Sequence, residues 1–292
     1  MITRRYFVGS TLISYIALAA PGFAATRPTD DPAARFAAIE KEAGGRLGVA
    51  ALDTGTVRRF GHREEERFPM CSTFKVLAVS AVLTQVDHGK ENLDRRIRFA
   101  AGDVIDGSPI SKDHIGDGMT LAELCAAALD YSDNTAANLI LSALGGPHAV
   151  TAFARSLGDP VTRLDRTEPT LNEATQGDPR DTTTPATMAA NLQKLLLGKA
   201  LAPASREQLT NWMIANKTGD ARLRAGLPHD WRIGDKTGTG ERGTANDIAI
   251  AWPPGRKPII VAVYLTGSTV SPDQQSAAIA DVARAVTATV AR

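Results

Sequence analysis

The chain has 292 residues, 43% of them hydrophobic, so it is long enough to bury a large core. Its 33 basic and 32 acidic residues give a net charge of +1 and are interspersed without long runs of one sign. This balance argues against a nucleic-acid partner and favours a small molecule. The two cysteines form no C-x-x-C pair, and the five histidines are scattered without metal-ligand spacing. We therefore expect neither a metal nor a cofactor.

The first residues have the layout of an export signal. Arg4 and Arg5 precede an apolar run over residues 8–20, and small residues follow near Ala25. The paired arginines resemble the twin-arginine class of signals. The apolar run is too short to span a bilayer comfortably. We expect residues 1–25 to be removed and the mature protein to be secreted or periplasmic, with no membrane contact.

The remaining elements place strands near both ends and helices in the middle. In chain order, the sequence predicts a helix at 31–43, strands at 47–52 and 57–60, helices at 72–87, 121–130 and 135–144, strands at 232–236, 244–252 and 259–265, and a helix at 272–290. A capping box from Thr120 to Glu123 marks the start of one helix. Residues 158–184 show no periodicity and are interpreted as a functional loop.

This order predicts an α/β fold of the α+β type. One antiparallel sheet, built from both termini and flanked by helices, would lie beside an inserted all-helical lobe. The α/β lobe would comprise residues 26–62 and 217–292, and the helical lobe residues 63–216. We expect residues 26–292 to form a single catalytic domain with its active site in the crevice between the lobes.

The segment Ser72-Thr73-Phe74-Lys75 opens a helix that is apolar around most of its surface. The spacing of Ser72 and Lys75 brings both side chains to one face of the first turn. Desolvation would lower the pKa of Lys75 and make it a usable base beside a serine nucleophile. Alone, the pattern is weak, because a serine cap followed by a surface lysine looks the same.

Two later segments are also weak when taken alone. Tyr131-Ser132-Asp133-Asn134 lies between predicted helices, where such residues are ordinary caps and turns. Lys236-Thr237-Gly238-Thr239-Gly240 ends a predicted strand and offers a cation and hydroxyls for a substrate carboxylate. The order S-x-x-K, S-D-N, K-T-G is, however, the motif set of class A β-lactamases and penicillin-binding proteins.

The chain resembles the class A serine β-lactamases over essentially its whole mature length. The resemblance rests on these three motifs and on Arg-Thr-Glu-Pro-Thr-Leu-Asn at 166–172 and Asp-Pro-Arg-Asp-Thr-Thr at 178–183. It implies a β-lactamase/transpeptidase-like fold and a monomer that hydrolyses penicillins and cephalosporins through a serine acyl-enzyme. Antibiotic resistance would follow.

The segment at 166–172 distinguishes the class A β-lactamases from the penicillin-binding proteins. Glu168 and Asn172 can share one helical face and hold a water between them, and hydrolysis of an ester requires that water. Penicillin-binding transpeptidases and carboxypeptidases resemble this chain in the other motifs but lack this element. The resemblance also implies a cis bond before Pro169 and a loop clamped by Arg166 and Asp181. If Arg166 and Asp181 were instead two exposed loop charges, an ion pair between them would contribute little to stability.

The resemblance assigns catalysis to Ser72, Lys75, Ser132 and Glu168. Ser72 would attack the lactam carbonyl while the backbone N–H groups of Ser72 and Thr239 hold the oxyanion. Whether Lys75 or Glu168 takes the first proton stays open. The implied substrate-binding residues are Asn134, Asn172, Lys236, Thr237, Thr239 and Arg222. Arg222 replaces an arginine that some members carry after the K-T-G strand, where this chain has Gly243-Thr244-Ala245-Asn246-Asp247.

Two departures from the family bear on substrate range. Gly107 stands where many members carry an aromatic residue at the mouth of the cleft, so a stacking wall is missing. Serine carbapenemases of this class usually join a cysteine beside the nucleophile to one after K-T-G-T. This chain has Cys71 but Gly240 at the second place, which argues against carbapenem hydrolysis. Whether Cys71 pairs with Cys125 depends on their separation in space.

Two alternatives remain at this stage. One is a D,D-peptidase that acts on cell-wall peptides, against which Glu168 and Asn172 argue. The other is a penicillin-sensing receptor domain that is acylated once and signals. Such a receptor would be expected to have membrane spans, and the sequence contains no second apolar span.

Overall fold

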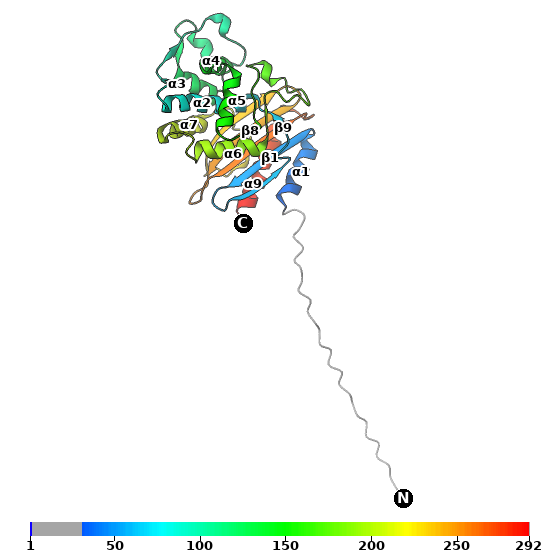
Figure 1. The fold of residues 1–292 in the computed structure, drawn as a ribbon. Helices are drawn as coiled ribbons and strands as arrows, with labels where there is room; N and C mark the ends of the chain where they lie inside the picture. The colour runs from blue at the N-terminus through cyan, green and yellow to red at the C-terminus, as the bar shows by residue number, and fades with distance from the viewer. Residues whose placement is uncertain (2–30, 292) are drawn as a thin grey trace.

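The computed structural model describes residue 1 and residues 31–291 (Figure 1). The predicted signal, residues 1–25, lies outside the described residues apart from Met1. The helices are α1 (Pro32–Ala43), α2 (Phe74–Asp87), α3 (Leu121–Asp130), α4 (Asn134–Leu144), α5 (Pro147–Ser156), α6 (Pro185–Leu196), α7 (Pro203–Ala215), α8 (Leu223–Gly226) and α9 (Pro272–Val290). The strands are β1 (Arg46–Asp53), β2 (Arg58–His62), β3 (Phe68–Pro69), β4 (Arg96–Ile97), β5 (Met119–Thr120), β6 (Thr182–Thr183), β7 (Arg232–Gly240), β8 (Thr244–Trp252) and β9 (Ile259–Thr266).

The main sheet joins the two ends of the chain. Its strand order is β2-β1-β9-β8-β7, and every neighbouring pair is antiparallel. β1 pairs with β9 along its whole length, from Arg46 opposite Thr266 to Asp53 opposite Ile259. The prediction of an antiparallel sheet built from both termini is therefore confirmed.

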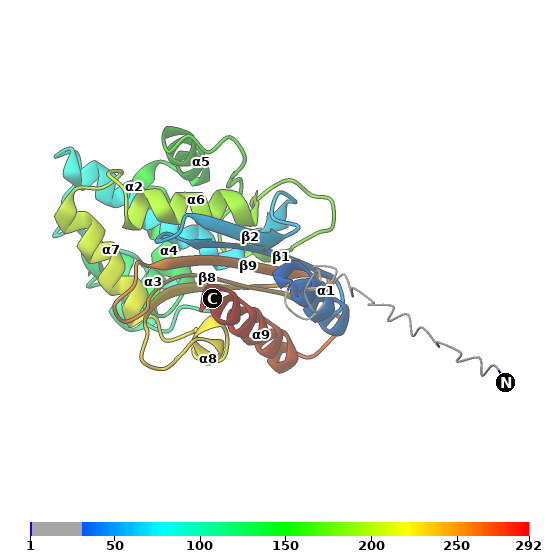
Figure 2. The same ribbon diagram turned by 90° about the horizontal axis from the view of Figure 1, so that it is seen from below.

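Both faces of this sheet are covered. Successive side chains of a strand point to opposite faces, so Leu47 and Val49 of β1 join one core while Ala50 and Leu52 join the other. Helices α8 and α9 lie on one side of the sheet, and α5 and α6 lie on the other (Figure 2). The second side continues into the helical lobe, whose α2 is buried over its first ten residues. The central strands β1, β9 and β8 are consequently buried almost throughout.

The helix boundaries follow their capping residues. Asp31 accepts a hydrogen bond from the amide of Ala33, and Thr120 and Glu123 form the predicted capping box at the start of α3. One predicted start was wrong. The helix expected at 72–87 begins at Phe74, because Cys71–Thr73 forms a tighter 3₁₀ turn whose first residue has φ 46°.

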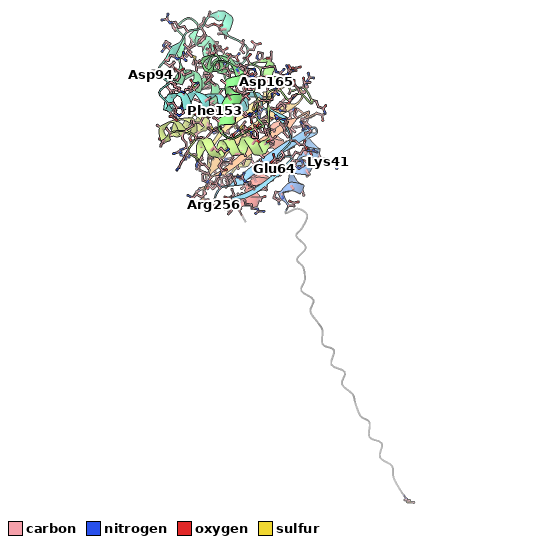
Figure 3. All side chains as sticks on the ribbon, in the orientation of Figure 1. Lys41, Glu64, Asp94, Phe153, Asp165 and Arg256 are labelled. Carbon is pink, nitrogen blue, oxygen red and sulfur yellow. The ribbon has the colours of Figure 1, made fainter. Side chains whose placement is uncertain are left out.

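The middle of the chain contains more regular structure than the sequence predicted. Helices α5, α6 and α7 and the short pairs β3–β6 and β4–β5 were not predicted. Residues 158–184 do form a loop, which contains only a 3₁₀ turn at Thr170–Asn172 and the two residues of β6. Figure 3 places Asp94 on the helical lobe and Arg256 at the far end of the other lobe.

Two open questions from the sequence are answered. Cys71 and Cys125 are both buried and free, so they do not pair with each other. Among the described helices, none is long and apolar enough to cross a membrane.

Candidate active site

Ser72 lies in the 3₁₀ turn that leads into α2, and it is 6% exposed. The turn is fixed from the sheet, because the side-chain amide of Asn246 on β8 donates to the carbonyls of Pro69 and Met70 at 2.9 and 3.0 Å. Within the turn itself, the Thr73 hydroxyl donates to the Met70 carbonyl at 2.8 Å. These bonds hold the left-handed backbone of Cys71 in a conformation that few residues adopt.

Lys75 follows one turn later and is completely buried. Its Nζ donates to the Ser132 carbonyl at 2.6 Å and to Asn134 Oδ1 at 2.8 Å, and it lies 3.1 Å from Glu168 Oε1. Burial lowers the pKa of Lys75, while the carboxylate of Glu168 acts against this shift. The amine of Lys75 is thus held between the turn at Ser132 and the loop that carries Glu168.

Ser132 stands in the turn between α3 and α4 with φ 59°. The next residue, Asp133, is fully buried and accepts hydrogen bonds from the amides of Ile110, Ser111 and Ala136. Because the Asp133 carboxylate accepts hydrogen bonds from three backbone amides, its neighbours Ser132 and Asn134 are held in place. Asn134 also donates to the Asp106 carbonyl at 2.9 Å.

Lys236 approaches the same hydroxyl from β7. Its Nζ donates to Ser132 Oγ at 2.9 Å and to the Thr237 carbonyl at 2.8 Å. Burial, and then repulsion by Lys75, hold the pKa of Lys236 well below its ordinary value. Since Lys75 Nζ is 3.5 Å from Ser132 Oγ, two lysines flank a single hydroxyl.

Glu168 faces Ser72 from the 158–184 loop. Its Oε1 accepts a hydrogen bond from Ser72 Oγ at 3.0 Å, and its Oε2 accepts one from Asn172 Nδ2 at 2.5 Å. The side chain of Asn138 on α4 fixes the backbone of Glu168, since its amide oxygen accepts from Glu168 N and its nitrogen donates to Glu168 O, both at 2.9 Å. The bond between Glu168 and Pro169 is cis, as expected.

The expected clamp of this loop is also present. Arg166 Nε donates to Asp181 Oδ2 at 2.6 Å, and Asp181 accepts further bonds from the amides of Asp165 and Arg166. The Asp181 side chain is 1% exposed and that of Arg166 is 16% exposed. The interpretation as two exposed loop charges is therefore wrong, and the pair joins the first and second halves of the loop.

Arg222 lies beside the K-T-G strand. Its NH1 group donates to the carbonyls of Gly238 and Asn246 at 2.8 and 2.7 Å, and its NH2 group donates to Thr239 Oγ1 at 2.7 Å. The hydroxyl of Thr237 is hydrogen bonded to that of Thr218. A guanidinium and two threonine hydroxyls thus come together along β7, which suits an anionic group.

Hydrogen bonds and one ion pair link eight of the ten predicted site residues: Ser72, Lys75, Ser132, Asn134, Glu168, Asn172, Lys236 and Thr237. The other two, Arg222 and Thr239, bond each other further along β7. Sequence reasoning missed Asn138 and Asn246, which position the network from α4 and β8. Asn138 is one helical turn after Asn134, so its spacing carried a usable signal. No cluster of three or more metal-ligating side chains occurs within the described residues.

Comparison with known proteins identifies the family. Residues 31–290 match the model of the β-lactamase enzyme family. β-Lactamase L2 of Stenotrophomonas maltophilia is 48% identical over 97% of this chain and 98% of its own length, and β-lactamase Toho-1 of Escherichia coli is 52% identical over 86% of each chain. The chain belongs to the class A β-lactamases. It is a hydrolase of β-lactams, and its activity confers antibiotic resistance.

Solved structures agree with this assignment. The class A β-lactamase of the last common ancestor of Gram-negative bacteria is 67% identical, with a TM-score of 0.88 over 89% of this β-lactamase and 99% of that chain. A class A β-lactamase described as putative, PenP from Rhodopseudomonas palustris, is 60% identical, with a TM-score of 0.87 over 88% and 98% of the two chains.

The two departures from the family have a structural basis in this β-lactamase. Gly107 has φ 78°, and a Cβ there would come within 2.5 Å of Asn134 Nδ2, so its backbone packs directly on that side chain. A Cβ at Gly240 would lie 2.7 Å from Cys71 Sγ and 2.8 Å from the Asn172 carbonyl. The nucleophile turn and the 158–184 loop therefore both pack against the end of β7.

Proposed function

We propose that this β-lactamase opens penicillins and cephalosporins through an ester on Ser72, within a single catalytic domain of residues 26–292. The contact that carries the proposal is the hydrogen bond of 3.0 Å from Ser72 Oγ to Glu168 Oε1, with Asn172 on the other carboxylate oxygen. This arrangement lets one carboxylate serve both the nucleophile and a later attacking water.

In the acylation step, Ser72 Oγ attacks the lactam carbonyl and the carbon–nitrogen bond breaks. Lys75 or Glu168 accepts the serine proton. Glu168 Oε1 already accepts a hydrogen bond from Ser72 Oγ at 3.0 Å, and Lys75 Nζ lies 3.1 Å from the same oxygen. Ser132 passes a proton to the departing lactam nitrogen and takes one in return from Lys75, whose Nζ is 3.5 Å from its hydroxyl. Lys236 supports this hydroxyl from 2.9 Å. The backbone N–H groups of Ser72 and Thr239 stabilise the oxyanion.

Substrate binding uses the polar edges of the cleft. Thr237, Thr239 and Arg222 hold the substrate carboxylate, and Arg222 acts partly by fixing the Thr239 hydroxyl at 2.7 Å. Asn134 binds the amide of the substrate side chain, while its own oxygen stays on Lys75.

Deacylation completes the cycle. Glu168 and Asn172 position a water, and Glu168 removes its proton as the water attacks the ester carbonyl of acylated Ser72. The free hydroxyl is restored when the tetrahedral intermediate collapses and the serine oxygen takes a proton. Since Asn138 fixes the backbone of Glu168 on both sides, the base keeps its position through both steps.

Mass spectrometry after addition of penicillin tests the role of Glu168. We expect a transient adduct on the wild type and a trapped adduct of the same mass on Glu168→Ala, because acylation can still proceed while the water loses its base. The matched control, Glu207→Gln, removes an exposed carboxylate on α7 and should behave as the wild type. A long-lived adduct on the wild type would instead fit the D,D-peptidase or penicillin-receptor alternatives.

We further propose that residues 1–25 are a twin-arginine signal and that the mature enzyme works as a monomer in the periplasm or outside the cell, without nucleic acid. The paired Arg4 and Arg5 support this export route. Changing both to lysine should leave active enzyme in the cytoplasm and abolish resistance of the host. Export at the wild-type level, measured by fractionation and hydrolysis of a chromogenic cephalosporin, would contradict the route.

A further inference from the structure

A cavity lies behind the 158–184 loop, and none of the ten predicted site residues lines it. Its volume is about 840 Å³, which lies within the range of small-molecule sites. Its walls come from the start of β1, the segment around β3, residues 174–179 and the turn between β7 and β8. The known reaction has no use for this space.

The cavity carries an excess of positive charge. Three arginines line it, Arg46, Arg67 and Arg242, together with the acids Glu66 and Asp178. Both acids are already paired, since Glu66 is bonded to Arg46 and Arg63 and Asp178 is bonded to Arg180. The wall therefore has little free negative charge to repel an anion.

Arg67 is the cation best placed to bind an anion. Its NH1 group donates to the Val161 carbonyl and to the Thr182 hydroxyl, both at 3.0 Å and both neutral. Within the described part of the chain, no carboxylate lies within 4.0 Å of its guanidinium, and its Nε and NH2 groups bond no protein acceptor. These bonds orient the guanidinium and leave donors for a ligand.

Part of the remaining wall is apolar and suited to a ring, beside the polar Thr175, Gln176 and Thr182. Pro69, Ala174 and Pro179 line the cavity, and the guanidinium of Arg46 lies over the ring of Phe68 at 4.5 Å from its centroid. Arg242 is held only loosely, by a hydrogen bond to the Glu173 carbonyl and a carboxylate contact at 4.0 Å. Its side chain can therefore turn towards a ligand.

We propose that this cavity binds a small organic anion with an aromatic body, and that Arg67 is the main anchor for its acid group. Arg242 closes over the ligand from the β7–β8 turn. The site lies apart from the substrate cleft, so the ligand and a β-lactam bind the enzyme together.

Titration of the mature enzyme with anilinonaphthalene sulfonate, followed by fluorescence and calorimetry, tests the binding. We expect one site, and about tenfold weaker binding in Arg67→Gln and Arg242→Gln, because each loses a charge-assisted hydrogen bond. Arg284→Gln is the matched control. It removes the same charge from an exposed residue of α9 and should bind as the wild type. Equal weakening in all three variants would overturn the proposal.

A second measurement locates the bound probe. If the probe occupies the proposed cavity, it will leave the apparent KM for a chromogenic cephalosporin largely unchanged while it binds. Purely competitive inhibition, with an inhibition constant equal to the Kd, would place the probe in the substrate cleft and overturn the proposal. Circular dichroism verifies the fold of each variant. If Arg67→Gln fails to fold, the half-exposed Arg242 decides the outcome.

Discussion

Charged side chains in the interior dominate the chemistry of this enzyme at the scale of single residues. Lys75 and Lys236 are both fully buried, and both contact the hydroxyl of Ser132. Water would stabilise their charges, but here burial lowers the pKa of each, and Lys75 lowers that of Lys236 further. The neutral amine of a lysine is the form that accepts a proton, so the same burial that costs stability prepares the site for proton transfer.

A buried acid behind these lysines gives a prediction about stability and pH. Asp247 on β8 is completely buried beside Asp235, and burial together with Asp235 holds the pKa of Asp247 well above its ordinary value. Arg222 acts against this shift. A carboxyl with a raised folded-state pKa contributes most to stability below its unfolded pKa of about 3.9 and loses that contribution as pH rises through the folded pKa.

We therefore predict that Asp247→Asn becomes more stable relative to the wild type as pH rises from about 4 to about 8. The asparagine oxygen can still accept from the Leu223 amide, which now donates to Asp247 Oδ2 at 3.0 Å. Its nitrogen can donate to Asp235. Thermal denaturation across this pH range measures the difference in Tm, and a difference independent of pH would show that Asp247 does not titrate as described.

Residue by residue, the sequence predicted the reacting groups better than the groups that position them. Ser72 and Lys75 are local neighbours on one helix, so their spacing alone indicates contact. Asn246 on β8 holds the nucleophile turn through its hydrogen bonds to the carbonyls of Pro69 and Met70. It comes 174 residues after Ser72 in the sequence. No local pattern could reveal that partner, because it depends on how β8 packs against the turn.

At the scale of elements, the 158–184 loop is an irregular segment held by side chains. Arg166 and Asp181 join the first and second halves of the loop, and α4 holds the backbone of Glu168 through Asn138. The Glu168 carboxylate, the proposed base, therefore takes its position from side-chain contacts and not from a helix or strand of its own. The position of this carboxylate depends on a few buried polar groups, and the contribution of each to stability and to deacylation can be measured.

We predict that Asp181→Asn lowers the free energy of unfolding by about 2 kcal/mol, because Arg166 loses its buried carboxylate partner and keeps the exposed Glu173 as its close one. Asparagine tolerates the left-handed backbone at this position, where φ is 57°, so the variant removes the charge without straining the chain. Deacylation should slow as well, since Glu168 loses a firm support. Chemical denaturation and the lifetime of the penicillin adduct measure the two effects.

The control for this prediction lies in the same loop. Arg180 pairs with Asp178 at 2.6 Å, but its side chain is 48% exposed, and exposed pairs contribute little. Arg180→Gln should therefore change stability and adduct lifetime much less than Asp181→Asn. Equal effects of the two substitutions would mean that the clamp has no special role.

Two of the helices that the sequence missed, α6 and α7, bury polar residues, whereas α5 has a clear amphipathic pattern that was overlooked. α7 buries Ser205 beside Leu209, Trp212 and Met213, and α6 buries Asn191, whose amide donates to Asp159 at 2.7 Å. Polar residues on a buried face obscure helical periodicity. The two-residue strands β3 and β6 exist only because distant segments pair, so no local signal marks them.

At the scale of the whole molecule, the sheet depends on helices from both ends of the chain. α1 and α9 pack on one face, where Phe36 of α1 and Ile279 and Val286 of α9 are completely buried. Without α9 that face would be exposed to water, which would cost much of the stability of the fold.

We predict that a chain ending at residue 270 yields no soluble, active enzyme, because it lacks α9 while retaining the five strands of the main sheet. A chain that begins at residue 26 serves as the control and should fold and hydrolyse penicillin when made without its signal. Solubility, circular dichroism and hydrolysis distinguish the two. Activity in the shortened chain would show that the helical lobe and the sheet suffice.

The central place of β9 also determines when activity can arise during synthesis. On the ribosome, β1 and β2 emerge early and can form a hairpin, but the other edge of β1 has no partner until β9 is made. An unpaired strand edge invites aggregation, so the nascent chain carries this hazard through most of translation. A bacterium making this enzyme therefore gains no protection from partly synthesised chains.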